Sequence, residues 1–206
     1  MGTFSATANS SSTIGYAQYG SSSWSTGSSS GACQGAYQGT TAAKSRVGVM
    51  VFSGAGAALK GKLIQSITLT ITCSGAGSGS SSKKLTFCQA NYQSLNTGVR
   101  GSAQVGATMG TLTGKFYSNT VTHTLNASSN AALFAAMKAY FETGNSVLVL
   151  YNGETSSSSG YSSNYARVTS CTISVVYIDA VVWYRDGSTW RQLSLIHISE
   201  PTRLAL

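Results

Sequence analysis

Acidic side chains are scarce in this chain: its 206 residues include only five Asp and Glu. They are Glu142, Glu154, Asp179, Asp186 and Glu200. Glycoside hydrolysis ordinarily needs two carboxylates a few ångström apart. One acid ends an expected helix, two follow the last expected strand of the main domain, one lies in the C-terminal tail, and only Glu154 falls in an expected surface loop. An acid pair, or a metal site built from carboxylates, is therefore hard to assemble.

Histidine and cysteine offer no better catalytic set. His123 and His197 are the only histidines, and no GxSxG motif marks a serine nucleophile for either. Thiolate catalysis would again depend on His123, which lies in an alternating strand pattern typical of a half-buried structural histidine. No P-loop and no GxGxxG after a strand occurs. The sequence predicts no enzyme, no metal site and no cofactor.

Aromatic rings in polar loops are abundant instead, and they suggest a binding surface. Aromatic faces stack on sugar rings, while Asn, Gln, Glu and Arg bind hydroxyl groups, so such residues form a shallow glycan site without catalysis. The alternative is that the tyrosines edge the core or pack against a neighbouring subunit. The candidate residues are Tyr92, Tyr151, Asn152, Glu154, Tyr161, Asn164, Tyr165 and Arg167.

The elements that must position these residues are mostly strands. In Leu63 to Cys73, the apolar residues from Ile67 onward alternate with threonines, which predicts one face towards a core and one wet, threonine-lined face. Cys171 to Tyr177 repeats this design. Arg46 to Phe52 is apolar on both sides, which predicts a central strand. Further strands are expected at 3–9, 85–92, 120–126 and 146–152.

The remaining segments are less regular. Residues 10–45 form either a long surface loop or a pair of short edge strands, and 92–118 hold two short strands at best. A serine- and glycine-rich turn between 63–73 and 85–92 predicts a hairpin with a long loop. A single helix is expected at about 130–142, with an N-cap from Ser128, Ser129 or Asn130 and a C-cap at Gly144. The fold class predicted is an all-β, jelly-roll-like antiparallel sandwich of about eight strands.

Composition narrows the range of partners. Charged residues make up 9% of the chain, against roughly 25% in ordinary soluble domains, and the net charge of +8 reflects scarce acids more than abundant bases. The only adjacent basic pair is Lys83-Lys84, so nucleic-acid binding is not expected, whereas a modest attraction to anionic cell-surface polymers fits. No run of 18 apolar residues and no signal-peptide pattern occurs, so no membrane segment is predicted.

Four cysteines are widely spaced: Cys33, Cys73, Cys88 and Cys171. Cys73 and Cys171 are in phase with the apolar faces of their strands, where a free cysteine behaves as a small hydrophobic residue. Free thiols are favoured over disulfides, although a Cys73 to Cys171 bridge between neighbouring strands is geometrically conceivable.

The order of the segments resembles a known family. The chain carries RVGVMVFSG, LIQSITLTITCSGAG, KKLTFCQANYQS, MGTLTGKFYSNT, the helix, VLVLYNGE and SCTISVVY. Over about residues 40–178 this order resembles the jelly-roll-like modules of tail-associated, minor structural proteins of tailed bacteriophages and prophages. It is also similar in plan to DNRLRE-type sandwich domains, although Arg46 and Phe52 stand one residue further apart than in that pattern.

Residues 180–192, AVVWYRDGSTWRQ, resemble the short hairpins that recur near the ends of phage tail and virion-surface proteins. Asp186-Gly187 is a strong signal for a two-residue turn. Residues 193–203, LSLIHISEPTR, resemble a translated sequencing adapter. The domain organisation predicted is a sandwich over 1–178, a hairpin over 179–192 that is the first copy of a truncated repeat, and a non-native tail over 193–206.

These resemblances imply a non-enzymatic structural or recognition module located in a virion. Its expected partners are host-surface glycans or other virion proteins, with a possible homo-oligomer and with neither nucleic acid nor membrane as a partner. The alternative is a bacterial cell-surface or secreted carbohydrate-binding or adhesion module with similar surface chemistry.

Overall fold

The fold is given by a computed structural model, which describes residues 1–20, 22–27, 31–38, 43–75, 82–154, 160–179, 182–186 and 189–193. For residues 37, 38, 43, 44, 182–186 and 189–193 the description covers the backbone alone. The predicted non-native tail falls outside the described residues, apart from its first residue.

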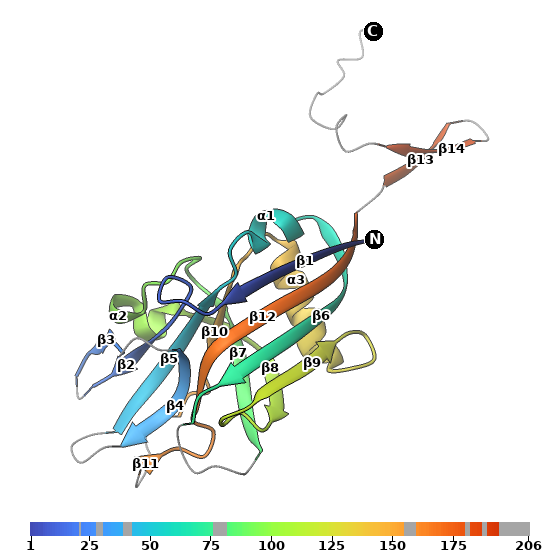
Figure 1. The fold of residues 1–206 in the computed structure, drawn as a ribbon. Coiled ribbons are helices and arrows are strands. Elements are labelled where there is room, and N and C mark those ends of the chain that lie inside the picture. The colour runs from blue at the N-terminus through green and yellow to red at the C-terminus, as the bar shows by residue number, and fades with distance from the viewer. Residues whose placement is uncertain are drawn as a thin grey trace.

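The main body forms two antiparallel layers packed face to face (Figure 1), which β4 (Ala32–Gln38) joins into one continuous twelve-stranded sheet that includes the short strand β11 (Gly160–Tyr161) paired to β4. The front sheet has the strand order β1 (Gly2–Ala8), β12 (Ala166–Asp179), β6 (Lys62–Cys73) and β9 (Thr120–Leu125). The back sheet has the order β8 (Val105–Gly114), β7 (Lys83–Ala90), β10 (Val147–Leu150), β5 (Ala43–Val51), β2 (Ile14–Tyr19) and β3 (Trp24–Thr26). The predicted all-β sandwich is confirmed.

Alternation along β6 produces the two faces that its sequence predicts. Ile67, Leu69 and Ile71 are buried in the core between the sheets, whereas the intervening threonines lie on the outer face. The core residues of β12 face them from the neighbouring strand, because Ile173 pairs with Leu69 and Cys171 with Ile71. Burying aliphatic side chains in this way stabilises a fold by about 1.5–3 kcal/mol each.

A second, smaller core lies on the outer face of the back sheet. Its buried members are Val47, Val49, Cys88, Ala90, Val147 and Val149, and Trp24, Leu95, Val105 and Tyr151 pack against them. The short helix α2 (Thr97–Arg100) packs against β2, β3 and β5, and the 3₁₀ turn η1 (Gly101–Gln104) follows it. This covering explains why β5 is apolar on both sides and confirms its predicted central position.

The predicted helix is confirmed as α3 (Ala131–Glu142). Its buried stripe of Leu133, Phe134, Met137, Tyr140 and Phe141 packs against β6 and β8, so the helix bridges the two sheets at one end of the sandwich. Gly144 ends the helix with a φ of 95°, as expected. Asn130, one of the three predicted N-cap residues, occupies the cap position in a left-handed conformation, but its side chain makes no capping hydrogen bond.

Several sequence interpretations need correction. The segments 63–73 and 85–92 do not form a hairpin, because β6 and β7 belong to different sheets. The described residues of 10–45 include three complete strands, β2, β3 and β4, and the start of β5, rather than a loop or one strand pair. Residues 92–118 hold α2, η1 and the single strand β8. A further helix, α1 (Ala55–Leu59), escaped prediction because one turn is too short to show a periodic stripe.

The two C-terminal strands, β13 (Val182–Asp186) and β14 (Thr189–Leu193), form a separate two-stranded sheet. Asp186 pairs with Thr189, which agrees with the predicted hairpin over this segment.

All four cysteines are free and buried, as favoured from the sequence. Burial raises the pKa of Cys73 and of Cys171 from the ordinary value of 9.0 to about 12, because the core does not solvate a thiolate. These thiols pack as apolar groups.

The Met137 side chain provides a test of the helix packing. Met137 is completely buried, so Met137→Ala should lower the free energy of unfolding by about 2–5 kcal/mol. The matched control, Lys138→Ala, removes the ion pair of Lys138 with Glu142 on the same helix and should cost less than about 1 kcal/mol. Urea unfolding followed by circular dichroism measures both, and equal losses would contradict the packing described.

The cysteine pKa values predict a stability that falls at high pH. Unfolded thiols lose their protons near pH 9.0, whereas folded Cys73 and Cys171 keep them up to about 12. The unfolded state then binds fewer protons, so the free energy of unfolding should fall as pH rises above 9.0. Urea titrations across this range measure the fall, and the double variant with Ala at both positions should show a smaller fall above pH 9.0. Part of the fall should remain, because burial also raises the pKa of Cys33 and of Cys88. If the free energy of unfolding depended on pH identically in the unchanged protein and the double variant, the raised pKa values of Cys73 and Cys171 would be contradicted.

Candidate functional site

The candidate residues gather around a corner made by β4. The first half of β4 pairs with β12, through residues 32–34, and its second half pairs with β5, through residues 35–38. Gly35 lies at the change of partner with a φ of 87°. A Cβ at this glycine would lie 2.7 Å from Oγ of Ser162 and 2.8 Å from Cα of Tyr165. Only glycine therefore lets the strand turn between the sheets beneath the loop that carries the predicted site.

Gln34 connects this corner to the back sheet. The residue is fully buried, and its Nε2 donates to the carbonyl oxygens of Lys84 at 2.6 Å and Asn164 at 2.9 Å. Its Oε1 accepts from the N–H of Thr86 at 2.9 Å. The pairing between β10 and β7 stops at Phe87, so the Gln34 amide satisfies backbone groups of β7 that no strand reaches.

Glu154 and Asn164 also form hydrogen bonds that connect the loop to the neighbouring strands. The Glu154 carboxylate accepts hydrogen bonds from Oγ of Ser162 and, at 3.1 Å, from Nδ2 of Asn164. Oδ1 of Asn164 accepts from the N–H of Lys84 at 3.0 Å. Oγ of Ser162 in turn accepts from the N–H of Ala36 at 2.9 Å. Two of the predicted sugar-binding groups thus hold the loop onto β4 and β7.

A buried cation lies beside this network. The ammonium group of Lys83 donates to the carbonyl oxygen of Tyr165 at 2.7 Å. Burial lowers the pKa of Lys83, while the nearby charge of Glu154 acts in the opposite direction. The lysine and the glutamate therefore partly balance each other electrostatically within the protein.

Aromatic rings and an arginine continue from the network to the surface. The Tyr161 ring is 40% exposed and packs on the Tyr165 ring, with 4.3 Å between centroids and the planes tilted by 42°. Tyr165 is buried, its hydroxyl donates to the sulfur of Cys33 at 3.7 Å, and burial raises its pKa. The Arg46 guanidinium lies 5.0 Å from the Tyr165 ring centroid and 5.5 Å from that of Tyr16. The result is a stack whose outermost ring is Tyr161.

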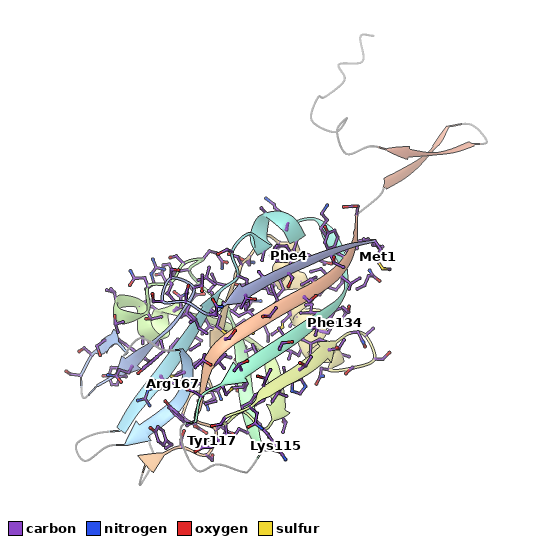
Figure 2. All side chains as sticks on the ribbon, viewed as in Figure 1. Met1, Phe4, Lys115, Tyr117, Phe134 and Arg167 are labelled. Carbon is purple, nitrogen blue, oxygen red and sulfur yellow. The ribbon has the colours of Figure 1, made fainter. Side chains whose placement is uncertain are left out.

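The other candidates occupy different surroundings. Arg167 pairs in register with Cys33, close to the same corner, as its position on β12 in Figure 2 shows. Asn152 accepts from the N–H of Glu154 at 3.1 Å, and Tyr151 packs into the outer core of the back sheet. Tyr92 follows the other end of β7, where the Arg100 guanidinium lies 4.1 Å from its ring. The structure thus leaves Tyr92 and the Tyr151 side chain away from the corner. It brings the six other predicted residues to one region: Asn152, Glu154, Tyr161, Asn164, Tyr165 and Arg167.

Sequence reasoning missed Gln34, Lys83 and Ser162. Their partners are backbone groups or side chains at least eight residues away, and most are far more distant in the chain. No local motif encodes such contacts. Within the described part of the chain, no cluster of three His, Cys, Asp or Glu could hold a metal ion. The helices described there are all too short or too polar to cross a membrane.

Comparisons with known proteins identify no relative. No protein-family model matches the chain, and no curated protein matches it.

The Gly35 corner can be tested with two matched glycines. Gly35→Ala should lower the free energy of unfolding by more than about 2 kcal/mol, because it combines left-handed strain with contacts that a Cβ cannot fit. Gly153 has a similar φ of 72° but open space around it, so Gly153→Ala should cost only about 1 kcal/mol of strain. Chemical denaturation measures the difference. Equal losses would mean that close packing at the corner is unimportant.

Proposed function

We propose that this chain is a non-enzymatic structural and recognition module of a phage or prophage virion. It is associated with the tail and contacts host-surface glycans or other virion subunits. The observation that carries the proposal is the exposed Tyr161 ring, held in place by its stack on Tyr165. A ring fixed before binding loses little conformational freedom when a sugar packs on it.

The chemistry of the reactive groups supports a role in recognition. The Glu154 carboxylate is occupied by Ser162 and Asn164. The His123 ring packs at 5.9 Å from Phe116, and burial lowers its pKa. A neutral imidazole in this place suits packing between the sheets.

The hydroxyl and aromatic groups on the surface support an uncharged glycan as the partner. The outer positions of the front sheet carry serine and threonine, and Tyr161 provides an aromatic face near the β4 corner. Hydroxyl groups and aromatic faces interact with sugars through hydrogen bonds and stacking, and they need no opposite charge. A neutral polysaccharide is therefore the preferred glycan class.

Glycan-array binding of purified protein tests this role, with Tyr161→Ala as the informative variant. Loss of the stacked ring should weaken glycan binding about tenfold, equivalent to about 1.4 kcal/mol. Tyr19→Ala is the control, since Tyr19 is 37% exposed but its ring packs on Trp24 and takes no part in the Tyr161–Tyr165 pair. This control should bind like the unchanged protein. An equal loss in both variants would contradict a site at Tyr161.

The virion assignment has its own experiment. Mass spectrometry of purified particles from an induced lysogen that encodes the chain should detect the protein. Absence from particles together with retained glycan binding would favour the bacterial surface or secreted module instead. Absence from particles with no binding to any cell-wall polysaccharide would refute both parts of the proposal.

A further inference from the structure

The outer face of the front sheet is a continuous array of hydroxyl groups in register across four strands. One row runs Thr7, Thr172, Thr70 and Thr122, and the next runs Ser5, Ser174, Thr68 and Thr124. Hydroxyl oxygens of adjacent threonines lie 3.3 Å apart between Thr70 and Thr122 and 2.8 Å apart between Thr7 and Thr172. The array ends at β9. Among the described strands, its threonines, Thr120, Thr122 and Thr124, have neighbours on β6 alone.

β9 is a regular edge strand, which α3 contacts less extensively than it contacts β8. Its one strand partner among the described residues is β6, and their pairing shows no register shift. Its sequence TVTHTL has no charged residue, proline or glycine. Natural sheets usually protect such an edge with lysine, proline, a bulge or a cover, because its backbone groups otherwise pair with another chain.

The neighbouring edge of the back sheet shows that protection. β8 pairs with β7 through two register shifts, and α3 packs against it. At the other edge of the front sheet, α1 packs against β1, and the ion pair of Lys62 with Asp179 lies at the end of the sheet nearest the start of β1. The contrast identifies β9 as the edge open to a partner strand.

The sequence of β9 is self-complementary about Thr122. If two copies pair antiparallel with this residue on the two-fold axis, Thr122 faces itself and Thr120 faces Thr124 of the second copy. Threonine pairs across antiparallel strands are favourable, and a two-fold interface requires this kind of self-matching surface. On the inner face, Val121 would lie opposite His123, so no like charges meet when the histidine is neutral.

We propose that β9 pairs with β9 of a second copy of this chain, joining two front sheets into one eight-stranded sheet with a continuous threonine face. The interface supplies backbone hydrogen bonds along one strand together with the flanking threonine pairs, so the association is reversible and depends on concentration. It is independent of the glycan site, because Tyr161 lies at the β4 corner and β9 lies at the far edge of the front sheet (Figure 1).

The test uses opposite charges at the axis. In sedimentation velocity over a concentration series, the unchanged protein should approach twice the mass of one chain. Thr122→Lys and Thr122→Glu should each remain monomeric, because each places like charges opposite one another. An equimolar mixture of the two variants should recover the dimer, now as a heterodimer with Lys facing Glu. Thermal unfolding of each variant checks that this exposed substitution leaves the fold intact.

The matched control is Thr111→Lys, an exposed threonine on the protected edge strand β8, which should dimerise like the unchanged protein. A monomer at every concentration, or dimers that persist in both single variants, would overturn the proposal. Open-ended growth into larger assemblies would also overturn it, because that result requires β9 to pair with a different edge, such as β1. Failure of the mixture to recover dimers would exclude the two-fold axis at Thr122.

Discussion

The sandwich depends on one strand, β4, that belongs to both sheets. A strand that leaves one sheet and enters the other must bend sharply, and at the bend its backbone approaches its neighbours closely. Gly35 permits the bend, while Gly48 allows β4 to cross β5, since a Cβ there would lie 2.7 Å from the Cys33 nitrogen. The bend brings Gln34 of β4 next to β7, whose pairing with β10 stops at Phe87 and leaves backbone groups without a strand partner.

Those backbone groups determine what the nearby polar side chains do. Gln34 and Asn164 replace the missing strand along β7, and Glu154 fixes Asn164 in place. A buried donor or acceptor left without a partner costs about 1–3 kcal/mol, so these side chains are committed to the fold. The same residue types that would suit sugar hydroxyls therefore face inward, and Tyr161 is left as the outermost member of the stack.

The sequence predicted strands well where burial is one-sided and aliphatic. In β6, β9 and β12 the alternation is visible because a solvated face of Ser and Thr contrasts with an apolar one. The prediction of strands failed for β2 and β4, because their buried positions include Ala, Cys, Gly and Tyr among many serines and glycines. It also misplaced the connection from β6 to β7, because a long glycine-rich segment does not encode whether the chain returns to the same sheet. The site was predictable as a region, but the inward direction of Glu154 and Asn164 depends on backbone partners distant in sequence.

A surface with few charges constrains how such a protein associates. Individual hydroxyl contacts with a neutral ligand exchange for contacts with water and contribute little each, and long-range charge steering is weak where charges are scarce. Useful affinity then requires either preorganisation or several simultaneous contacts. The Tyr161 ring, packed on Tyr165, provides the preorganisation. Pairing of two copies through β9 would provide the simultaneous contacts, because one dimer carries two such rings. The small fraction of charged residues in this chain, 9%, therefore favours recognition by repeated neutral contacts over recognition by a single charged site.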